Sequence, residues 1–245
     1  MTGNLENLRA ELAPEGKLRA GINLGNILLV TGSTPAGDPA GVAPDMARAI
    51  AERLEVPVAY VPFASPGEVA DAVGSDSWDI ALIADDPERA ETIAFAAAYV
   101  EIEATYLVPE GSPFADVGDV DRDGVRIAVS GRSAYDLYLS RNLQHAELFR
   151  AQGVSAAAEL FVSDGLDALA GLRPALALEA EKLPGARVLA GKFTAIQQAI
   201  GTRRGNDAGA AFLAEFVEQA KASGLVGRLI ERHGVTGRLS VAPPA

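Results

Sequence analysis

The chain contains no cysteine in its 245 residues. This absence excludes a thiolate nucleophile, a cysteine-bound iron–sulfur cluster, a zinc ribbon and any disulfide. It does not choose a cellular compartment, because exported proteins can also do without disulfides. The two histidines, His145 and His233, are far apart in the sequence. We therefore expect no metal site.

Basic residues are also scarce, since 21 lysines and arginines stand against 33 aspartates and glutamates, for a formal net charge of −12. Phosphate backbones and anionic lipid surfaces repel a chain of this charge. Nucleic acid is therefore not an expected partner. Hydrophobic residues make up 49% and charged residues 22% of the chain. This composition is typical of a folded globular protein.

Long apolar runs are missing as well. No stretch reaches the roughly 18 consecutive apolar residues of a transmembrane helix, so we expect a chain that does not span a membrane. The first residues, "MTGNLENLRAELAPEGKL", have no basic segment followed by an apolar one, which a secretory leader requires. As the sequence stands, a cytoplasmic protein is expected, and a periplasmic one if a leader was removed. The start at Met1 favours the first.

Strand-length apolar runs alternate with segments of helical periodicity, which indicates βα units around mostly parallel sheets. In the first half we predict a Gly/Pro-rich loop at 32–41 between helices and strands. The predicted strands are 17–23, 56–63 and 78–84, and the predicted helices are 44–54 and 66–74.

The same rhythm restarts in the second half of the chain. A strand at 125–130 precedes a helix at 133–143, which Ser133 is placed to cap. Strands and helices then alternate up to residue 191. A strand at 193–202, a long helix at 206–224 and a short helix follow, and "TGRLSVAPPA" is predicted to be a frayed tail.

Arg89 lies in a short polar turn just after the predicted strand 78–84. In open α/β sheets, ligands bind beyond the carboxyl ends of strands. We therefore expect the Arg89 guanidinium to hold an anion. The plainer alternative is a surface arginine paired with Glu88 or Glu91, which would add little stability.

Four stretches together resemble the family 3 extracellular solute-binding proteins, the receptors of polar amino acid ABC importers. They are "GKLRAGIN", "GVAPDMARAIAERLEVPVAYVPF", "WDIALIADDPERAETIAFAAAYV" and "VRIAVSGRSAYDLYL". The resemblance covers about residues 16 to 234. It implies a two-lobe α/β fold of the periplasmic-binding-protein type II class, in which two crossing strands join the lobes and a hinge closes on the ligand.

The resemblance also implies where the lobes divide. Lobe one would comprise residues 1–106 and 193–245, and lobe two residues 107–192. Each lobe would be a mostly parallel sheet flanked by helices. The crossing strands would lie near Glu103–Pro109 and Gly191–Thr194.

The family resemblance also assigns ligand contacts. The arginine of the family's "PER" turn binds the ligand carboxylate in a bidentate pair, and Arg89 matches it. Ser133 matches a second-lobe serine or threonine that binds the same carboxylate with the amides of a helix N-terminus. Arg132, where the family commonly has glycine, adds a second cation.

Other polar residues are weaker candidates for ligand contact, because each has a plainer role. Turn geometry explains the asparagines of "INLGN", and packing explains the tyrosines. Trp78 is expected in the core or at its rim. The ligand-contact candidates are Asn23, Asn26, Tyr135 and Gln197. Residues such as Tyr106, Tyr135 and Tyr138 are more often half-buried packing residues with a satisfied hydroxyl.

Two departures from the family pattern bear on the ligand. Asp85 and Asp86 replace the usual hydroxyl residues before the "PER" turn. The second-lobe aspartate that accepts the ligand ammonium falls at Leu172 or Arg173, so that acceptor is missing and a buried ammonium would lack a partner. We expect a small carboxylate with a second acidic or polar group, or an amine held by Asp85 or Asp86. Tight binding of ordinary neutral L-amino acids would count against this reading.

The expected function is a non-catalytic solute-binding protein that closes on a small carboxylate-bearing metabolite, an amino acid or a related organic acid. An ABC permease is the expected partner if the chain is exported, and a hinged cleft is compatible with a monomer. No cofactor is expected, since "GSTPAGDPAG" lacks the Lys-Ser/Thr of a P-loop. "SGRSAYD" likewise lacks the closing glycine of a nucleophile elbow.

Two alternatives remain open. Some relatives of these receptors resemble cyclohexadienyl dehydratases, which would need a general acid such as Glu103 or Asp86. A carboxyl with a raised pKa would favour that enzyme. The missing leader suggests a cytoplasmic ligand sensor, which co-purification with a regulatory partner would favour.

Overall fold

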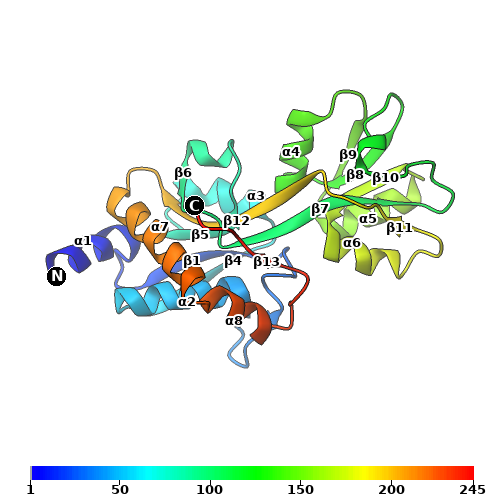
Figure 1. Ribbon diagram of the computed structural model, residues 1–245. Helices are drawn as coiled ribbons and strands as arrows, with labels where there is room; N and C mark the ends of the chain where they lie inside the picture. Colours follow the sequence, from blue (N-terminus) through cyan, green and yellow to red (C-terminus); the bar gives the residue numbers. More distant parts are fainter. Residues whose placement is uncertain (1) are drawn as a thin grey trace. The chain divides into compact units, whose positions relative to one another are not determined.

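A computed structural model describes residues 2–245, which pack as two compact units. Unit 1 contains the chain up to Glu101 together with Gln197–Ala245, and unit 2 is Ile102–Ile196. Strands β7 (Val100–Val108) and β12 (Thr194–Arg203) carry the chain from one unit to the other (Figure 1). The sequence prediction places the lobe boundaries a few residues away from these, at 106/107 and 192/193, and they stay a prediction. Met1 lies outside the described residues.

The sheet of unit 1 is built on three parallel strands, β4 (Val58–Phe63), β1 (Leu18–Asn23) and β5 (Ile80–Ala84). Strand β12 runs antiparallel to β5, with Gln198 opposite Ala84, and β6 (Ile93–Phe95) runs antiparallel to β12. The carboxyl ends of β1 and β5 therefore lie at the same edge as the first residues of β12 in this unit. We call this the carboxyl edge of unit 1.

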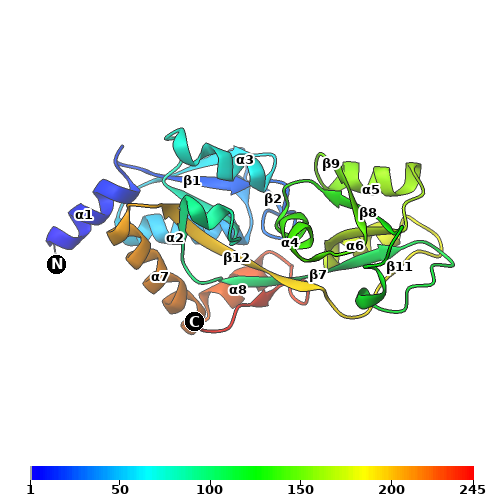
Figure 2. The ribbon, with the colours of Figure 1, turned by 90° about the horizontal axis from the view of Figure 1, so that it is seen from above.

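Helices cover both faces of this sheet. Helices α2 (Val42–Leu54), α7 (Asp207–Ala222) and α8 (Leu225–Arg232) lie on one side of the strands (Figures 1 and 2). Helix α3 (Pro66–Asp71), continued by the 3₁₀ turn η1 (Ala72–Gly74), lies on the other. Under α3 the Trp78 ring is buried, and its Nε1 donates to the Val69 carbonyl at 3.0 Å. The expected packing role of Trp78 is confirmed.

The loop predicted at 32–41 contains a small hairpin, β2 (Gly32–Ser33) and β3 (Pro39–Ala40). Gly41 follows it and precedes the first turn of α2, with φ 155° and ψ −175°. A Cβ atom at this position would lie 2.1 Å from the Leu29 carbonyl oxygen. Only glycine lets the segment after β1 approach the start of α2 this closely.

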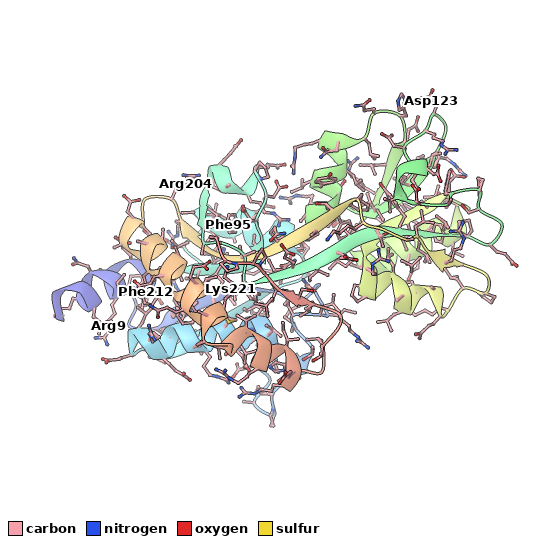
Figure 3. The ribbon with its side chains drawn as sticks, viewed as in Figure 1. Arg9, Phe95, Asp123, Arg204, Phe212 and Lys221 are labelled. Carbon is pink, nitrogen blue, oxygen red and sulfur yellow. The ribbon has the colours of Figure 1, made fainter. Side chains whose placement is uncertain are left out.

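The first residues form helix α1 (Thr2–Leu12), which the sequence analysis did not predict. Leu8 and Leu12 are buried. The Arg9 Nε donates to the Leu54 carbonyl at 2.7 Å, which ties α1 to the end of α2 (Figure 3). Gly209 on α7 donates its N–H to the Glu11 carboxylate at 2.7 Å. Helix α1 is thus an integral part of unit 1.

The prediction of a frayed C-terminal tail is wrong. Residues Ser240–Val241 form strand β13, which pairs antiparallel with the start of β7. The buried Ala242 donates its N–H to the Tyr99 carbonyl at 3.1 Å. Lys221 on α7, labelled in Figure 3, donates to the Pro243 carbonyl at 2.8 Å. The tail is ordered because β7 offers it backbone partners, a tertiary effect that turn-rich composition hides.

Unit 2 has three parallel strands, β9 (Glu147–Ala151), β8 (Arg126–Ser130) and β10 (Ala168–Leu172). Strand β7 runs antiparallel to β10, and β11 (Arg187–Val188) runs antiparallel to β7. Helices α5 (Val154–Ser163) and α6 (Arg173–Ala180) enclose a core with Phe161 and Leu169. The carboxyl end of β8 leads directly into α4 (Ala134–Asn142). A short 3₁₀ turn, η3 (Val117–Asp119), precedes β8.

The predicted strands and helices are found at the expected places, with ends that differ by a few residues. None of the helices within residues 2–245 combines the length and the hydropathy that a bilayer crossing requires.

Candidate functional site

Arg89 begins the 3₁₀ turn η2 (Arg89–Glu91), just beyond the end of β5. Its side chain is buried, at 5% exposure, and its Nη1 donates to the Ala84 carbonyl at 2.8 Å. The burial contradicts the plainer alternative of a surface arginine. A cation is thus held firmly at the carboxyl edge of unit 1, where the sequence analysis expected one.

The two aspartates before this turn, Asp85 and Asp86, differ in burial and in hydrogen bonding. Asp86 is buried, at 4% exposure, and its Oδ1 accepts the Glu88 N–H at 3.0 Å while its carbonyl accepts the Ala90 N–H. Asp86 therefore shapes the turn that carries Arg89. Asp85 is exposed, and its N–H donates to the Gln197 carbonyl on β12 at 2.9 Å.

The Asp85 carboxyl has an unusual electrostatic environment. Although Asp85 as a residue is exposed, the surrounding atoms partly bury its carboxyl group, and this desolvation raises its pKa above the ordinary value. The neighbouring Asp86 charge raises the pKa further. The Arg89 charge and a backbone hydrogen bond from Asp86 act in the opposite direction. The ionised carboxylate is thus less stable here than in water.

The amide candidates of unit 1 all have partners within the protein. Asn23 Oδ1 accepts the Gly25 N–H at 3.0 Å, and Asn26 Oδ1 accepts the Leu28 N–H at 3.2 Å. These bonds confirm the expected turn-forming role of both asparagines. A ligand carboxylate would have to use their side-chain N–H groups. The Gln197 side chain donates to the Glu101 carboxylate at 2.9 Å.

Strand pairing within unit 1 brings several predicted residues to its carboxyl edge. Asn23 ends β1, Asp85 follows β5, and Gln197 lies opposite Asp85 on the antiparallel β12. Arg89 reaches the end of β5 through the Ala84 carbonyl. Asn26 lies three residues beyond β1, and its N–H donates weakly to the Asn23 carbonyl at 3.5 Å. This edge therefore offers a guanidinium, amides and the exposed carboxylate of Asp85.

The remaining predicted residues belong to unit 2. Ser133 is the N-cap of α4, and its Oγ accepts the Asp136 N–H at 3.1 Å, which confirms the cap. Tyr135 is buried, and the side chains of Ser133 and Ser130 are close enough to its hydroxyl to lower its pKa against the effect of burial. Burial raises the pKa of Tyr135, so this hydroxyl keeps its proton at neutral pH.

Asp136 is an organising residue that the sequence analysis missed. It is only 2% exposed, and its Oδ2 accepts the Arg132 N–H at 2.7 Å. Arg150 Nε lies 2.9 Å from its Oδ1 and forms an ion pair with it. The signal was the S-x-x-D spacing of Ser133 and Asp136, which is close to a capping box. The first turn of α4 therefore already contains a carboxylate from the protein.

Arg132 is exposed and has a left-handed backbone, with φ 61°. A side chain in this region is strained, which explains why glycine suits the position. The Asp136 bond to the Arg132 N–H holds the strained conformation. The Ser133 N–H donates to the Ser130 carbonyl at 3.2 Å. The N–H groups of Arg132 and Ser133 thus already donate to acceptors within the protein. Fewer backbone donors remain near the start of α4 for the anion that was expected to bind there.

Replacing Asp136 with alanine is expected to lower the free energy of unfolding by about 2 kcal/mol, because the change removes charge-assisted hydrogen bonds from a buried group. Urea unfolding would measure the loss. The control is Glu159→Ala, which removes an exposed carboxylate on α5 and should change stability by less than about 0.5 kcal/mol. Equal effects of the two changes would contradict the organising role.

Arg173 is the first residue of α6. It is one of the two residues, with Leu172, that stand at the position expected for the family's ammonium-binding aspartate. Its Nε donates to Glu103 on β7 at 2.7 Å, its Nη1 donates to the Leu189 carbonyl at 3.2 Å, and its Nη2 donates to the Gly191 carbonyl. Lys192 Nζ lies 3.5 Å from the same Glu103 carboxylate. The hydrogen bond from Arg173 lowers the pKa of Glu103. A residue of this kind gives up its proton readily and is a poor general acid at neutral pH.

The tyrosines Tyr106 and Tyr138 pack around one phenylalanine in unit 2. The Tyr106 and Phe193 ring centroids lie 4.7 Å apart, and those of Tyr138 and Phe193 lie 5.9 Å apart. Tyr106 is buried, and this burial raises the pKa of its hydroxyl. The packing role expected for both tyrosines is confirmed.

Both histidines pair with aspartates. His233 Nε2 lies 2.9 Å from Asp45 Oδ2, and His145 Nδ1 lies 3.2 Å from Asp123 Oδ1. In the part of the chain that the structure describes, no three histidine, aspartate or glutamate side chains gather as metal ligands would.

Comparison with known proteins adds to this geometry. The family model of the bacterial extracellular solute-binding proteins, family 3, matches residues 30–236. No curated protein sequence matches the chain.

Solved structures of the same fold cover nearly the whole chain. An amino acid ABC transporter substrate-binding protein from Streptococcus pneumoniae, bound to L-arginine, is 20% identical with a TM-score of 0.75 and covers 96% of this chain and 99% of its own. A putative ABC transporter binding component from Wolinella succinogenes, complexed with lysine, is 21% identical with a TM-score of 0.74. It covers 89% of this chain and 95% of its own. An ancestral amino acid-binding protein, described as a precursor of cyclohexadienyl dehydratase, is 23% identical with a TM-score of 0.73, over 91% and 97%. These likenesses confirm the predicted fold class.

Proposed function

The chain belongs to the bacterial extracellular solute-binding proteins of family 3, and on this premise we propose that it is a non-catalytic receptor for a small carboxylate-bearing solute. The solute would be an amino acid or a related organic acid. Two proteins of the same fold are described as bound to arginine and to lysine, both of which carry a carboxylate.

The observation that supports this proposal best is the buried guanidinium of Arg89 beyond the end of β5. A cation taken out of water is costly, so its place in the fold needs a reason. The Ala84 carbonyl fixes its orientation. A guanidinium offers five N–H donors in a planar fork, which matches a carboxylate in a bidentate pair. Arg89 is therefore the proposed anchor of the solute carboxylate.

The proposal gives Ser133 of unit 2 a second contact with the solute. A solute that touches both units binds a closed arrangement more tightly than an open one, and so shifts the population toward closure. An ABC permease would then receive the closed form. Asn23, Asn26, Gln197, Tyr135 and Arg132 are proposed as further contacts.

The test is thermal unfolding of the ligand-stripped protein against amino acids, dicarboxylates, keto acids and aromatic acids. A bound solute must raise the midpoint, by the equivalent of about 2.7 kcal/mol at 100 times its Kd. Arg89→Ala is expected to weaken binding by about 100-fold, since it removes a charge-assisted pair from a buried place. Arg89→Lys, which keeps the charge but not the fork, should recover only part of the affinity.

The matched control is Arg204→Ala. Arg204 is an exposed arginine of the same unit, and its Nε donates to the Ala90 carbonyl of the same turn at 2.6 Å. It should leave solute affinity unchanged. The proposal fails if no carboxylate shifts the midpoint, or if Arg89→Ala binds the solute as well as the wild type does.

A dehydratase-like enzyme is the second candidate, because one structure of this fold is described as a precursor of cyclohexadienyl dehydratase. The expected acids fit this role poorly. Glu103 has a lowered pKa, and Asp86 is used in the turn. The pKa of Asp85 is raised, which is the direction that favours a general acid, so the enzyme deserves an assay. Release of an aromatic acid from a cyclohexadienyl acid would replace the receptor proposal.

A cytoplasmic ligand sensor is the third candidate, and it would use the same carboxylate site. It differs from a transport receptor in its partner. Co-purification with a regulatory protein rather than a permease would favour it.

A further inference from the structure

At the carboxyl edge of unit 1, Asp85 differs from the nearby acids Asp86 and Glu101 in its exposure and in its partners. Asp86 is buried, and its Oδ1 accepts the Glu88 N–H just before the Arg89 turn. Glu101 accepts the Gln197 side chain at 2.9 Å. Asp85 is exposed, and the bond from its N–H to the Gln197 carbonyl fixes its backbone against β12. Its carboxylate is thus presented from a rigid position, beside the turn that holds Arg89.

Glu103, which lies on β7 in unit 2, already pairs with two cations of the protein. Glu103 receives a hydrogen bond from Arg173 at 2.7 Å and lies 3.5 Å from Lys192. Arg173 in turn is bound to the carbonyls of Leu189 and Gly191. A second ammonium at Glu103 would have to displace one of these cations. Glu103 is therefore a poor acceptor for an amino group of a solute.

The raised pKa of Asp85 also favours this residue as the acceptor of a solute cation. Its ionised form is disfavoured by partial burial and by the adjacent Asp86, and the Arg89 charge compensates only in part, since the net shift of its pKa is upward. An added cation would stabilise this carboxylate. Carboxyl groups whose pKa is perturbed by desolvation and a neighbouring charge cluster at functional sites.

We infer that Asp85 accepts the ammonium group of the solute whose carboxylate Arg89 binds. The inference rests on the proposed function. Arg89 and Asp85 lie four residues apart on either side of one turn, so a single loop of unit 1 would recognise both charges of a zwitterion. The solute class is then amino-bearing acids, and keto acids and dicarboxylates are excluded. Asp85 would then accept the ammonium group that the family's second-lobe aspartate binds, a role that the cationic Arg173 cannot fill.

Matched pairs of acids test this inference by calorimetry. Each amino acid is compared with the hydroxy acid of the same carbon skeleton, which keeps the carboxylate and loses the ammonium. The wild type should prefer the amino acid by about 10- to 100-fold, the range of a charge-assisted hydrogen bond. Asp85→Asn should lose most of that preference while its affinity for the hydroxy acid stays the same.

The control is Glu88→Gln, which neutralises an exposed carboxylate in the same turn and should keep the preference. An Asp85→Asn variant that still prefers the amino acid, or a wild type that binds both acids equally, overturns the inference and leaves the carboxylate receptor standing. If neither acid of any pair binds, the proposed function fails as well.

Stability without solute gives an independent readout. Because the pKa of Asp85 is higher in the folded chain than in the unfolded one, its contribution to stability is fully present below the unfolded pKa and is lost as pH rises through the folded pKa. At neutral pH, Asp85→Asn should therefore unfold at a temperature no lower than the wild type. A lower midpoint would indicate a structural role for Asp85 and contradict the inference.

Discussion

Replacing Gly41 with alanine is expected to lower the free energy of unfolding by about 3–5 kcal/mol. The backbone of Gly41 has φ 155° and ψ −175°, in a region that is essentially reserved for glycine and costs other residues about 1–3 kcal/mol. The added Cβ would also lie 2.1 Å from the Leu29 carbonyl oxygen and 2.8 Å from Val30 Cα. Since both obstacles are backbone atoms, relief requires a shift of the chain, which costs about as much again.

Urea unfolding would measure this loss, with Gly32→Ala as the control. A Cβ at Gly32, in the neighbouring hairpin, would meet no atom within 4 Å. That variant should change stability by less than about 0.5 kcal/mol. A small effect at both glycines would show that the segment after β1 yields easily. A large effect at Gly41 would show that the loop carrying Asn26 is held rigidly against α2.

The second large effect is expected at Asp79, where alanine should lower the free energy of unfolding by about 3–5 kcal/mol. Asp79 is buried, and its Oδ2 accepts the Arg19 N–H at 2.8 Å and the Arg19 Nε at 3.1 Å. Its Oδ1 accepts from Arg19 Nη2 at 2.7 Å. Removing this carboxylate would leave a largely buried guanidinium without its main counter-charge, and denaturant unfolding would report the cost.

The control uses the other acid on the same arginine. Glu15 lies 3.0 Å from Arg19 Nη1, but its side chain is 53% exposed. Because exposed ion pairs contribute at most about 1 kcal/mol, Glu15→Ala should have a small effect. If Glu15→Ala cost as much as Asp79→Ala, burial would not be the reason for the importance of Asp79.

The position of the proposed solute anchor could be predicted from the sequence, but its environment could not. An apolar run of strand length followed by a polar turn places Arg89 beyond the end of a strand, and this inference needs no knowledge of the tertiary contacts. Its burial depends on a tight turn shaped by Asp86 and on the Ala84 carbonyl, which are tertiary features. The same limit applies to Asp85 and Asp86, which look alike in "DDPER" and differ only in the fold.

The elements that escaped prediction are those without a strong local signal. Strand β13 is two residues long and exists because β7 offers it backbone partners. Helix α1 is stabilised by contacts with residues far along the chain, such as Leu54 and Gly209. Asp136 is different, because the S-x-x-D spacing was present in the sequence and could have identified it.

The place of β12 in the sheet of unit 1 has a consequence for biosynthesis. Ala84 on β5 is paired with Gln198, so the chain between them, including all of unit 2, must be synthesised before β5 gains its second neighbour. Unit 2 is continuous in sequence and can fold as soon as it emerges, since domains generally fold as units. Until then the buried strand "IALIA" presents an open, apolar sheet edge, the kind of surface that aggregates unless it is protected. The nascent chain should therefore depend on chaperones most during the synthesis of residues 85 to 203.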